Sequence, residues 1–585
     1  MVLSLQEVAK HNTKKDCWVI IHDKAYDLTD FLDEHPGGPG IILKYAGKDA
    51  TKAFDPIHPS DTLQKYLKPQ YHKGEVEKRK PSEMGPKKKL VPKKKGQAKS
   101  QQPQQAQQQA NTVSNGGSGN VVDEYDVEYD EQDDMDPIPV PNETKSSSTG
   151  ASGNDDDDDD DDDDEAEYEE VLLDEDGEPI PKEEIARLKR VENKPNFGQM
   201  YNLMDFEFVA RHTMEKTAWG YYSSGCDDEI SMRENHLAYH RVWFKPRVMV
   251  DVTNVDFSTT MLGTKTSAPF YVTATALGKL GHPDGEKVLT RACDKQDIIQ
   301  MIPTLASCSF DEIVDQATNK QTQWFQLYVN ADKEVCKKLV QHAEKRGCKG
   351  LFITVDAPQL GRREKDMRTK DFEDLSHVQG GGEDTIRDQG AARAISSFID
   401  TSLKWDDLEW FKSITKMPII LKGVQCVEDA VKAAQLGCQG IVLSNHGGRQ
   451  LEFSRPPIEI LIELMPILKE QNLDKNFEVY VDGGVRRATD ILKAIALGAK
   501  GVGIGRPFLY AMSTYGDDGV IRAMQILKEE LEMNMRLLGV TSIDQLNSDY
   551  VDARGFTTGR FAPEDKLYSR VYQPMVTPTF KDSKL

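Results

Sequence analysis

One stretch of the chain, Gly440-Ile441-Val442-Leu443-Ser444-Asn445-His446-Gly447-Gly448-Arg449-Gln450, joins an apolar run to a polar end that contains two glycines. A short apolar run is typical of a strand buried on both faces, as in a parallel sheet. His446 and Arg449 follow the carboxyl end of that strand. An imidazole accepts a proton near neutral pH, a guanidinium binds a carboxylate, and glycines let the backbone approach a flat ligand. The stretch predicts a base beside an anion-binding group; a strand-ending turn with a surface His and Arg is the plainer alternative.

The same kind of apolar run recurs seven more times, and amphipathic helical stretches such as 428–436 and 488–497 separate the runs. Eight alternating strand and helix units predict an α/β fold, a (β/α)8 barrel within residues 196–563. The other seven expected strands are 270–273, 298–301, 324–328, 351–355, 418–421, 479–481 and 501–504.

Polar residues and glycines gather just after these expected strands. Active-site groups of this fold lie at the carboxyl ends of the strands, and phosphate sites often follow strands seven and eight. We therefore expect a single site, with backbone amides and arginines binding a phosphate at the last two strand ends. Taken singly, Lys422 could be a surface lysine with a buried stem and Asp356 a helix cap. The strand-end residues are Thr275-Ala276, Gln326, Tyr328, Thr354, Asp356, Lys422, Ser444, His446, Asp482-Gly483-Gly484 with Arg486, and Gly505-Arg506.

Residues 1–77 have a different, mixed pattern. Segments 18–21 and 24–28 are expected to be strands, and Thr29 is expected to cap a short helix. His35 and His58 each lie next to a proline, on two separate loops. Two such histidines suit ligation of a haem from both sides, which leaves no open axial position and so favours electron transfer. Either histidine alone would more often be a surface residue.

Residues 78–195 are predicted to be a flexible linker. The segment contains two lysine triplets, a glutamine-rich stretch and ten consecutive aspartates, 155–164. Such a composition cannot bury enough apolar surface to offset ordering entropy, so we expect disorder to about Glu178 and a helix from Glu183. Residues 123–178 carry 28 acidic residues and one lysine, a net charge of −27, against −23 for the whole chain. The remainder is near neutral and does not indicate a nucleic-acid partner, although the lysines would also suit a nuclear-localisation signal.

The cysteines and the two ends of the chain indicate the cellular compartment in which the protein is expected. The eight cysteines are scattered without a Cys-x-x-Cys pair, which argues against zinc fingers, iron–sulfur clusters and disulfides and favours a reducing compartment. No apolar run reaches the roughly 18 residues of a membrane span, so no membrane is expected as a partner. The first residues do not resemble a leader. The last three, Ser583-Lys584-Leu585, match a peroxisomal address.

Residues 1–77 resemble a cytochrome b5 domain over their whole length. The resemblance implies that haem b binds here, with His35 and His58 as the axial ligands. The motifs that carry it are Asp16-Cys17-Trp18-Val19, Tyr26-Asp27-Leu28-Thr29-Asp30-Phe31, His35-Pro36-Gly37-Gly38 and Asp49-Ala50-Thr51-Lys52-Ala53-Phe54.

The expected barrel resembles the FMN-dependent 2-hydroxy-acid oxidase and dehydrogenase family. The resemblance implies that FMN is the cofactor and a small 2-hydroxy acid the substrate. Its motifs are Tyr221-Tyr222-Ser223-Ser224-Gly225, Gln326-Leu327-Tyr328, Thr354-Val355-Asp356-Ala357-Pro358, Ser444-Asn445-His446-Gly447-Gly448-Arg449-Gln450 and Asp482-Gly483-Gly484-Val485-Arg486.

The family resemblance also implies roles for the substrate side of the site. His446 would remove a proton from the 2-hydroxy acid, either from carbon or from oxygen with hydride transfer, and Asp356 would stabilise the imidazolium. Tyr328 would bind the substrate oxygen. The substrate carboxylate would be bound by Tyr221 and Arg449, with Arg363 on the lid side.

On the cofactor side, the resemblance places Lys422 beside the pyrimidine edge of the flavin. Ala276 and Leu305 would line the pocket for the substrate side chain, whose modest size suits a methyl group. Pro303 lies where the family usually has a hydroxyl residue, which puts one flavin hydrogen bond in doubt. The expected flavin-ring contacts are Gln326, Thr354 and Ser444, and the expected phosphate contacts are Gly483, Arg486, Gly505 and Arg506. Further expected cofactor contacts are Thr275, Ala276, Asp482 and Gly484.

The order of the two domains is similar to that in the flavocytochrome b2 family. This implies oxidation of L-lactate to pyruvate, transfer of electrons from FMN to haem b and on to cytochrome c, and a homotetramer linked by tails such as 564–585. One alternative is a peroxisomal 2-hydroxy-acid oxidase that passes electrons to oxygen. Another is a haem electron carrier on an inactive barrel. Resemblance favours the mitochondrial intermembrane space, the last three residues favour the peroxisome, and the cytoplasm is a third compartment. A polar stretch, 371–390, is expected to be a lid or disordered.

Overall fold

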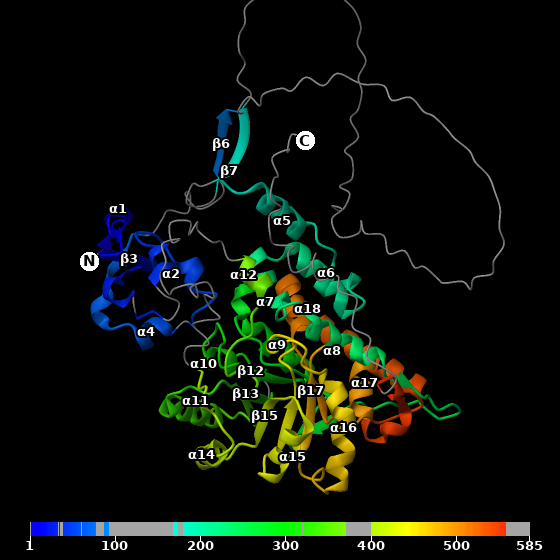
Figure 1. The fold of residues 1–585 in the computed structure, drawn as a ribbon. Helices are drawn as coiled ribbons and strands as arrows, with labels where there is room; N and C mark the ends of the chain where they lie inside the picture. Colours follow the sequence, from blue (N-terminus) through cyan, green and yellow to red (C-terminus); the bar gives the residue numbers. More distant parts are fainter. Residues whose placement is uncertain are drawn as a thin grey trace, which may run out of the picture. The chain divides into compact units, whose positions relative to one another are not determined.

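The computed structural model of the 585-residue chain describes residues 2–32, 34–35, 39–59, 61–77, 87–92, 168–173, 179–318, 321–369 and 399–556. The aspartate run, the expected lid, the tail and the last three residues lie outside these ranges. The chain forms two compact units, one made of residues 1–81 and 181–585 and the other of residues 82–180. Figure 1 shows the fold of the described residues.

The N-terminal segment forms a five-stranded sheet in the order β1-β5-β4-β3-β2. Its buried core includes Cys17, Val19, Ile21, Leu28 and Leu32, so the alternating apolar residues of the two predicted strands form one face of the sheet. The strands are β1 (Val2–Leu3), β2 (Asn12–Thr13), β3 (Asp16–Ile21), β4 (Lys24–Asp27) and β5 (His72–Val76), and the helices are α1 (Leu5–Val8), α2 (Pro39–Leu43), α3 (Thr51–Phe54) and α4 (Thr62–Tyr66).

The predicted helix cap at Thr29 is wrong. A 3-10 turn spans Thr29–Phe31, and its N-cap is Leu28, which has no side-chain oxygen to offer. The Thr29 hydroxyl instead accepts a hydrogen bond from the Cys17 amide and donates one to Asp27. Thr29 therefore ties the end of β4 to the start of β3, and its side chain does not cap the helix.

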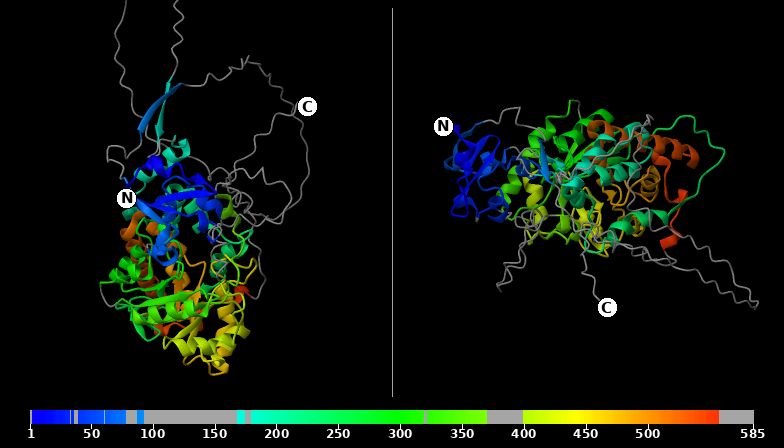
Figure 2. Two further views of the ribbon diagram at one scale, coloured as in Figure 1. Left: turned by 90° about the vertical axis from the view of Figure 1, so that its left-hand side faces the viewer. Right: turned by 90° about the horizontal axis from the view of Figure 1, so that it is seen from above.

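Eight parallel strands close into a barrel, which confirms the predicted fold. Helices cover the outside of the strands in all views (Figures 1 and 2). The strands are β11 (Phe270–Val272), β12 (Ile299–Ile302), β13 (Gln323–Leu327), β14 (Leu351–Thr354), β15 (Ile419–Val424), β16 (Gly440–Leu443), β17 (Glu478–Asp482) and β18 (Gly501–Ile504). The helices of the barrel are α9 (Glu286–Gln296), α10 (Phe310–Val314), α11 (Lys333–Lys345), α12 (Glu364–Thr369), α14 (Asp407–Ile414), α15 (Val427–Gln435), α16 (Pro457–Glu470), α17 (Ala488–Ala496) and α18 (Arg506–Leu538).

Large side chains fill one part of the barrel interior. Tyr271, Trp324, Phe352 and Tyr480 are fully buried and form a second core cluster, apart from the one between strands and helices. Their rings contact one another edge-on or stacked, with centroids 4.7–6.2 Å apart. A cavity among the described residues lies beyond this filling, and its lining includes residues that follow the carboxyl ends of the strands.

The region before the barrel contains α5 (Lys182–Glu192), α6 (Leu203–Thr213), α7 (Lys216–Ser223) and α8 (Ile230–His240). The helix expected from Glu183 is therefore confirmed as α5. Arg187 and Arg190 of α5 donate to the Thr213 and His212 carbonyls at the end of α6, so this part of the expected linker lies against the barrel unit.

The structure also differs from the expected unstructured linker at two short segments. β6 (Lys87–Pro92) and β7 (Tyr168–Leu173) pair antiparallel within the second compact unit. Both segments contain apolar residues next to the charged runs. The mean composition of residues 78–195 is dominated by charged and polar residues and therefore does not reveal these two strands. Among the described residues, no helix is both long and apolar enough to cross a membrane.

Candidate active site and haem-binding site

The cavity opens at the carboxyl ends of the barrel strands. Polar and charged side chains gather along its wall, as in a ligand-binding site. Its lining includes these predicted site residues: Tyr221, Thr275, Ala276, Gln326, Tyr328, Thr354, Arg363, Lys422, His446, Arg449, Asp482, Gly483, Gly484, Arg486, Gly505 and Arg506. Leu305 and Pro303 line it as well. The two remaining predictions, Asp356 and Ser444, lie directly behind His446 and hydrogen-bond to it.

His446 lies between a carboxylate and a phenol. Its Nδ1 is 3.1 Å from Asp356 Oδ1, and its Nε2 is 3.0 Å from the Tyr328 hydroxyl. A carboxylate only accepts hydrogen bonds, so Nδ1 carries the proton and Nε2 is the free base. Burial lowers the pKa of His446 below its ordinary value, although Asp356 acts in the opposite direction. Burial raises the pKa of Tyr328, which keeps its hydroxyl protonated. The three residues therefore form a neutral base with a hydrogen-bond donor beside it.

Two guanidinium groups face the same cavity. Burial and the charge of Arg363 lower the pKa of Arg449 to about 9. Nε of the buried Arg363 has no hydrogen-bond partner among the described residues. Arg449 donates to the Tyr221 carbonyl and packs over the Tyr221 ring, with its guanidinium carbon 5.0 Å from the ring centroid. Arg363 is buried and Arg449 partly buried, and keeping two adjacent cations there is costly in the absence of a bound anion. This end of the cavity is therefore suited to a carboxylate.

The backbone at His446 is strained. Its φ is +59°, in the left-handed region that non-glycine residues rarely occupy. The Asn445 side chain accepts a hydrogen bond from the Gly448 amide, and the His446 amide donates to Ser444 Oγ. Buried Asn235 on α8 then binds Asn445 through two reciprocal amide hydrogen bonds of 2.7 and 2.8 Å. This amide pair fixes the turn that presents the base.

Sequence reasoning missed Asn235. It lies 210 residues from Asn445 and belongs to no motif that predicted a site. We predict that Asn235→Ala lowers kcat about 10- to 100-fold, because the His446 turn loses its support and the base is displaced. Stopped-flow reduction of the cofactor checks this. Asn202→Ala is the matched control, since Asn202 only caps α6. Equal losses in the two variants would contradict a positioning role.

The other side of the cavity carries the expected ring contacts. Gln326 donates to Thr354 Oγ1 at 2.8 Å, and Lys422 lies 3.7 Å from Asp482. Gly423, which sequence reasoning also missed, has φ +104°. A Cβ at Gly423 would lie 2.4 Å from Asp356 Cγ, so only glycine here leaves room for the carboxylate behind His446.

The far end of the cavity is suited to a phosphate. Gly484 has φ +80°, and a Cβ there would lie 2.2 Å from the Asn235 carbonyl oxygen, so this loop approaches α8 closely. Burial lowers the pKa of Arg506, whose three donor nitrogens bind the carbonyls of Tyr222, Gly447 and Ser224. Arg486 pairs with Glu207 at 3.3 Å. A bound dianion would offset the cationic charge of these two arginines.

The residues present fit FMN. Buried Thr275 Oγ1 has no hydrogen-bond partner among the described residues, and it lines the cavity together with Gln326, Thr354 and Lys422. These polar groups suit the ring of a flavin, and the two arginines suit its phosphate. Pro303 offers neither an amide proton nor a hydroxyl group to the flavin ring.

The two predicted haem ligands face each other in the N-terminal segment. The ring centroids of His35 and His58 are 6.2 Å apart. Metal–imidazole bonds are about 2.0–2.1 Å, so two rings bound from opposite sides of one iron have centroids roughly 6 Å apart. His58 Nδ1 lies 3.1 Å from the Phe54 carbonyl, and donating there leaves Nε2 free for a metal. Burial lowers the pKa of His58, which keeps it in the neutral form that binds metal. The pair therefore fits haem b.

Comparisons with known proteins agree with both sites. Residues 210–553 match the FMN-dependent dehydrogenase family, and residues 4–77 match the cytochrome b5-like heme/steroid binding domain. The chain therefore belongs to the FMN-dependent dehydrogenases and carries a cytochrome b5-like domain in front of its barrel.

Three known proteins show the similarity over longer stretches. The chain is 48% identical over 581 residues to an L-lactate dehydrogenase (cytochrome) of Wickerhamomyces anomalus, covering 99% of this chain and 85% of that protein. It is 44% identical over 594 residues to the protein of the same description from Saccharomyces cerevisiae, with the same coverage. A solved structure of a flavocytochrome b2 double variant with pyruvate bound matches 69% of this chain and all of that chain, with a TM-score of 0.61 and 52% identity.

Proposed function

We propose that the chain oxidises L-lactate, or a closely related small 2-hydroxy acid, to the 2-oxo acid and passes the electrons through haem b to an external acceptor. One observation carries the proposal. A neutral histidine base, two guanidiniums and an apolar wall formed by Ala276 and Leu305 line one cavity. Such a site suits a small acid with a hydroxyl group next to its carboxylate. Relatives that match almost the whole chain are described as L-lactate dehydrogenases (cytochrome).

The substrate is positioned by charge and by hydrogen bonds. Arg449 and Arg363 bind its carboxylate, and Tyr221 packs against Arg449. The Tyr328 hydroxyl lies 3.0 Å from His446 Nε2, so both groups meet the substrate at its hydroxyl-bearing carbon. The short side chain then faces Ala276 and Leu305. Positioning of this kind holds the substrate in a reactive geometry before any bond changes.

Proton removal falls to His446. Its unprotonated Nε2 takes the proton, and the imidazolium that forms is stabilised by Asp356 at 3.1 Å. Burial opposes charge on Asp356, but His446, together with Lys422, lowers the pKa of Asp356 below its ordinary value, so the carboxylate stays ionised. When bound, FMN supplies a two-electron acceptor and haem b a one-electron carrier.

The base must be neutral to act, which fixes the pH dependence. Because the pKa of His446 lies below its ordinary value of 6.5, we expect kcat/KM to be constant above pH 6.5 and the acid limb of its pH profile to lie at lower pH. Asp356→Asn removes the charge that raises this pKa, so the acid limb should move to lower pH while kcat falls about 10²-fold. A pH profile of cofactor reduction measures both effects. An acid limb that moves to higher pH would contradict this assignment.

Anaerobic mixing with L-lactate tests the whole proposal. Flavin and haem absorbance are followed together by stopped flow in the full chain. Bleaching of the flavin followed by reduction of the haem is the expected result. Bleaching with an oxidised haem would favour the alternative of an oxidase that uses oxygen. No bleaching with L-lactate or glycolate would leave a haem carrier on an inactive barrel as the better description.

Three finer points belong to the same proposal. We propose cytochrome c as the acceptor, because a haem with two histidine ligands transfers electrons and does not bind oxygen.

We also propose a homotetramer, which the exposed apolar residues Trp243, Val248 and Met249 support as a subunit contact. The peroxisomal address rests on the last three residues, and a tagged chain with and without them tests it.

A further inference from the structure

A buried carboxylate lies behind the substrate pocket. Glu286, the first residue of α9, is 0% exposed. Its Oε1 accepts hydrogen bonds from the amides of Gly278 and Ser307 at 2.7 and 3.0 Å. Its Oε2 accepts from the Cys308 amide and the Ser307 hydroxyl, both at 3.2 Å. Backbone amides thus offset the cost of burying this charge.

The donors come from two different loops. Gly278 lies in the loop after β11, whereas Ser307 and Cys308 lie in the loop after β12. Two further hydrogen bonds join these loops directly, from the Leu277 amide to the Leu305 carbonyl at 3.3 Å and from the Lys279 amide to Ser307 Oγ at 2.8 Å. Glu286 therefore joins the first two loops at the carboxyl end of the barrel through hydrogen bonds to both.

The same two loops carry the apolar wall of the cavity. Ala276 lies two residues before Gly278, and Leu305 lies two residues before Ser307. Both line the cavity together with His446 and Arg449. The separation of Ala276 and Leu305 is consequently fixed from behind by the carboxylate of Glu286.

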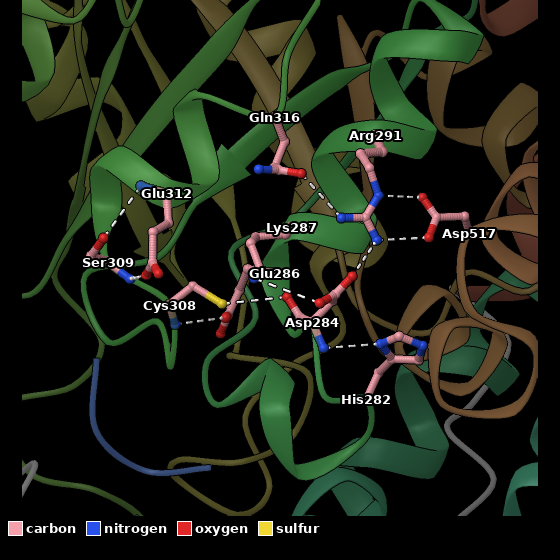
Figure 3. Close-up of polar contacts among 10 residues, drawn as sticks. All are labelled: His282, Asp284, Glu286, Lys287, Arg291, Cys308, Ser309, Glu312, Gln316 and Asp517. Atoms are coloured by element: carbon pink, nitrogen blue, oxygen red, sulfur yellow. Dashed lines mark hydrogen bonds and ion pairs between the residues drawn. The ribbon is translucent and has the colours of Figure 1, made fainter. Parts of the chain in front are cut away.

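The helix that carries Glu286, α9, is itself held in place. Arg291 on α9 binds both carboxylate oxygens of Asp517 on α18, at 2.7 and 2.8 Å, and also binds Asp284 at 2.9 Å and Gln316 at 3.1 Å (Figure 3). The positive end of the α9 dipole lies at Glu286 and favours its negative charge. The carboxylate therefore cannot move freely with either loop.

The loop after β11 needs such support. Leu277 has φ +58°, in the left-handed region, and a strained residue persists only where its surroundings over-determine it. The Tyr222 hydroxyl donates to the Leu277 carbonyl at 2.7 Å from one side. Glu286 binds the next amide, that of Gly278, from the other side.

We propose that Glu286 is a positioning residue that sets the width of the substrate side-chain pocket and thereby selects among 2-hydroxy acids by side-chain size. The inference rests on the proposed function, because it assigns the pocket between Ala276 and Leu305 to the side chain of that substrate. Glu286 acts through the two loops and does not line the cavity.

Glu286→Gln tests the proposal. The glutamine amide group would face backbone N–H donors, so at least one of them loses its acceptor and the loops separate. We expect kcat/KM for L-lactate to fall about ten-fold while kcat/KM for glycolate, which has no side chain, changes less than about two-fold. The ratio of the two values is the measurement, because a general structural defect would lower both equally.

Glu312→Gln is the matched control. Glu312 on α10 also accepts a hydrogen bond from a backbone amide, that of Ser309 at 2.8 Å, but this contact belongs to the capping box of α10 (Figure 3). This variant should keep the wild-type ratio. Hydrogen exchange of the intact chain gives a readout that does not depend on activity. The amides of Gly278, Ser307 and Cys308 should lose protection in Glu286→Gln and keep it in Glu312→Gln.

Three outcomes would overturn the proposal. One is an equal loss for lactate and glycolate in Glu286→Gln, and another is unchanged protection of the three amides. If Glu286→Gln fails to fold, Glu286→Asp takes its place, since it keeps the charge but has a shorter side chain. An unchanged ratio of kcat/KM for lactate and glycolate in Glu286→Asp is the third outcome. A wild-type chain that oxidises neither acid would instead overturn the proposed function, so the two failures are distinguishable.

Discussion

Replacing His446 by glutamine is expected to lower kcat for L-lactate by about 10³-fold, the typical contribution of a positioned general base. Glutamine fills a similar volume and can still hydrogen-bond to Tyr328, but it cannot take up a proton. Its nitrogen carries no lone pair that corresponds to Nε2 of the neutral imidazole. The measurement is the rate of flavin bleaching after anaerobic mixing with saturating L-lactate.

A second histidine–aspartate pair provides the control. His342 on α11 lies 2.9 Å from Asp311, in a partly exposed position. His342→Gln removes the same chemical group without touching the cavity, so it should leave the bleaching rate within about two-fold, as surface changes usually do. Bound FMN, seen in the visible spectrum, and Tm should match the wild type in both variants. A His446→Gln chain that still bleaches at the wild-type rate would show that another group is the base.

The barrel and the strand-end residues could be predicted because both follow from local patterns. A strand buried on both faces needs a continuous apolar run, and all eight runs became barrel strands. The fold then brings residues such as Tyr328, Lys422 and His446 to one end, although up to 118 residues separate them. The position of a residue just after a predicted strand was therefore enough to predict that it belongs to the site.

The support behind these groups could not be predicted in this way. Asn235 fixes the His446 turn from α8, and Glu286 binds two loops from α9. Each makes its contacts across the tertiary structure, and an Asn or Glu on a helix has no periodicity that distinguishes a buried bond from a solvated one. Gly423 shows the same limit, because its need for glycine comes from Asp356, 67 residues away. Sequence patterns locate reacting groups better than the residues that position them.

Replacing His58 by alanine is expected to abolish the haem band of the purified chain. One of two axial bonds to iron is lost, so haem affinity should fall by more than the roughly 10- to 100-fold that loss of an outer hydrogen-bond partner costs. His35 alone cannot hold the iron from both sides. The absorbance of the haem band relative to that of the flavin measures the loss, and added imidazole should restore part of the band by filling the space of the missing ring. His11→Ala, which removes a partly exposed histidine paired with Asp16, is the control and should keep its haem.

The same variant separates the two half-reactions. All groups that bind and deprotonate the substrate, including His446, Tyr328 and Arg449, lie outside residues 1–77, so flavin bleaching by L-lactate should continue at the wild-type rate in His58→Ala. Reduction of cytochrome c should be lost, because the proposed function supplies that acceptor through the haem. If cytochrome c reduction persisted without the haem band, electrons would leave directly from the flavin and the N-terminal domain would serve another acceptor. A chain that loses both steps would instead show that haem binding supports the fold of the barrel's site.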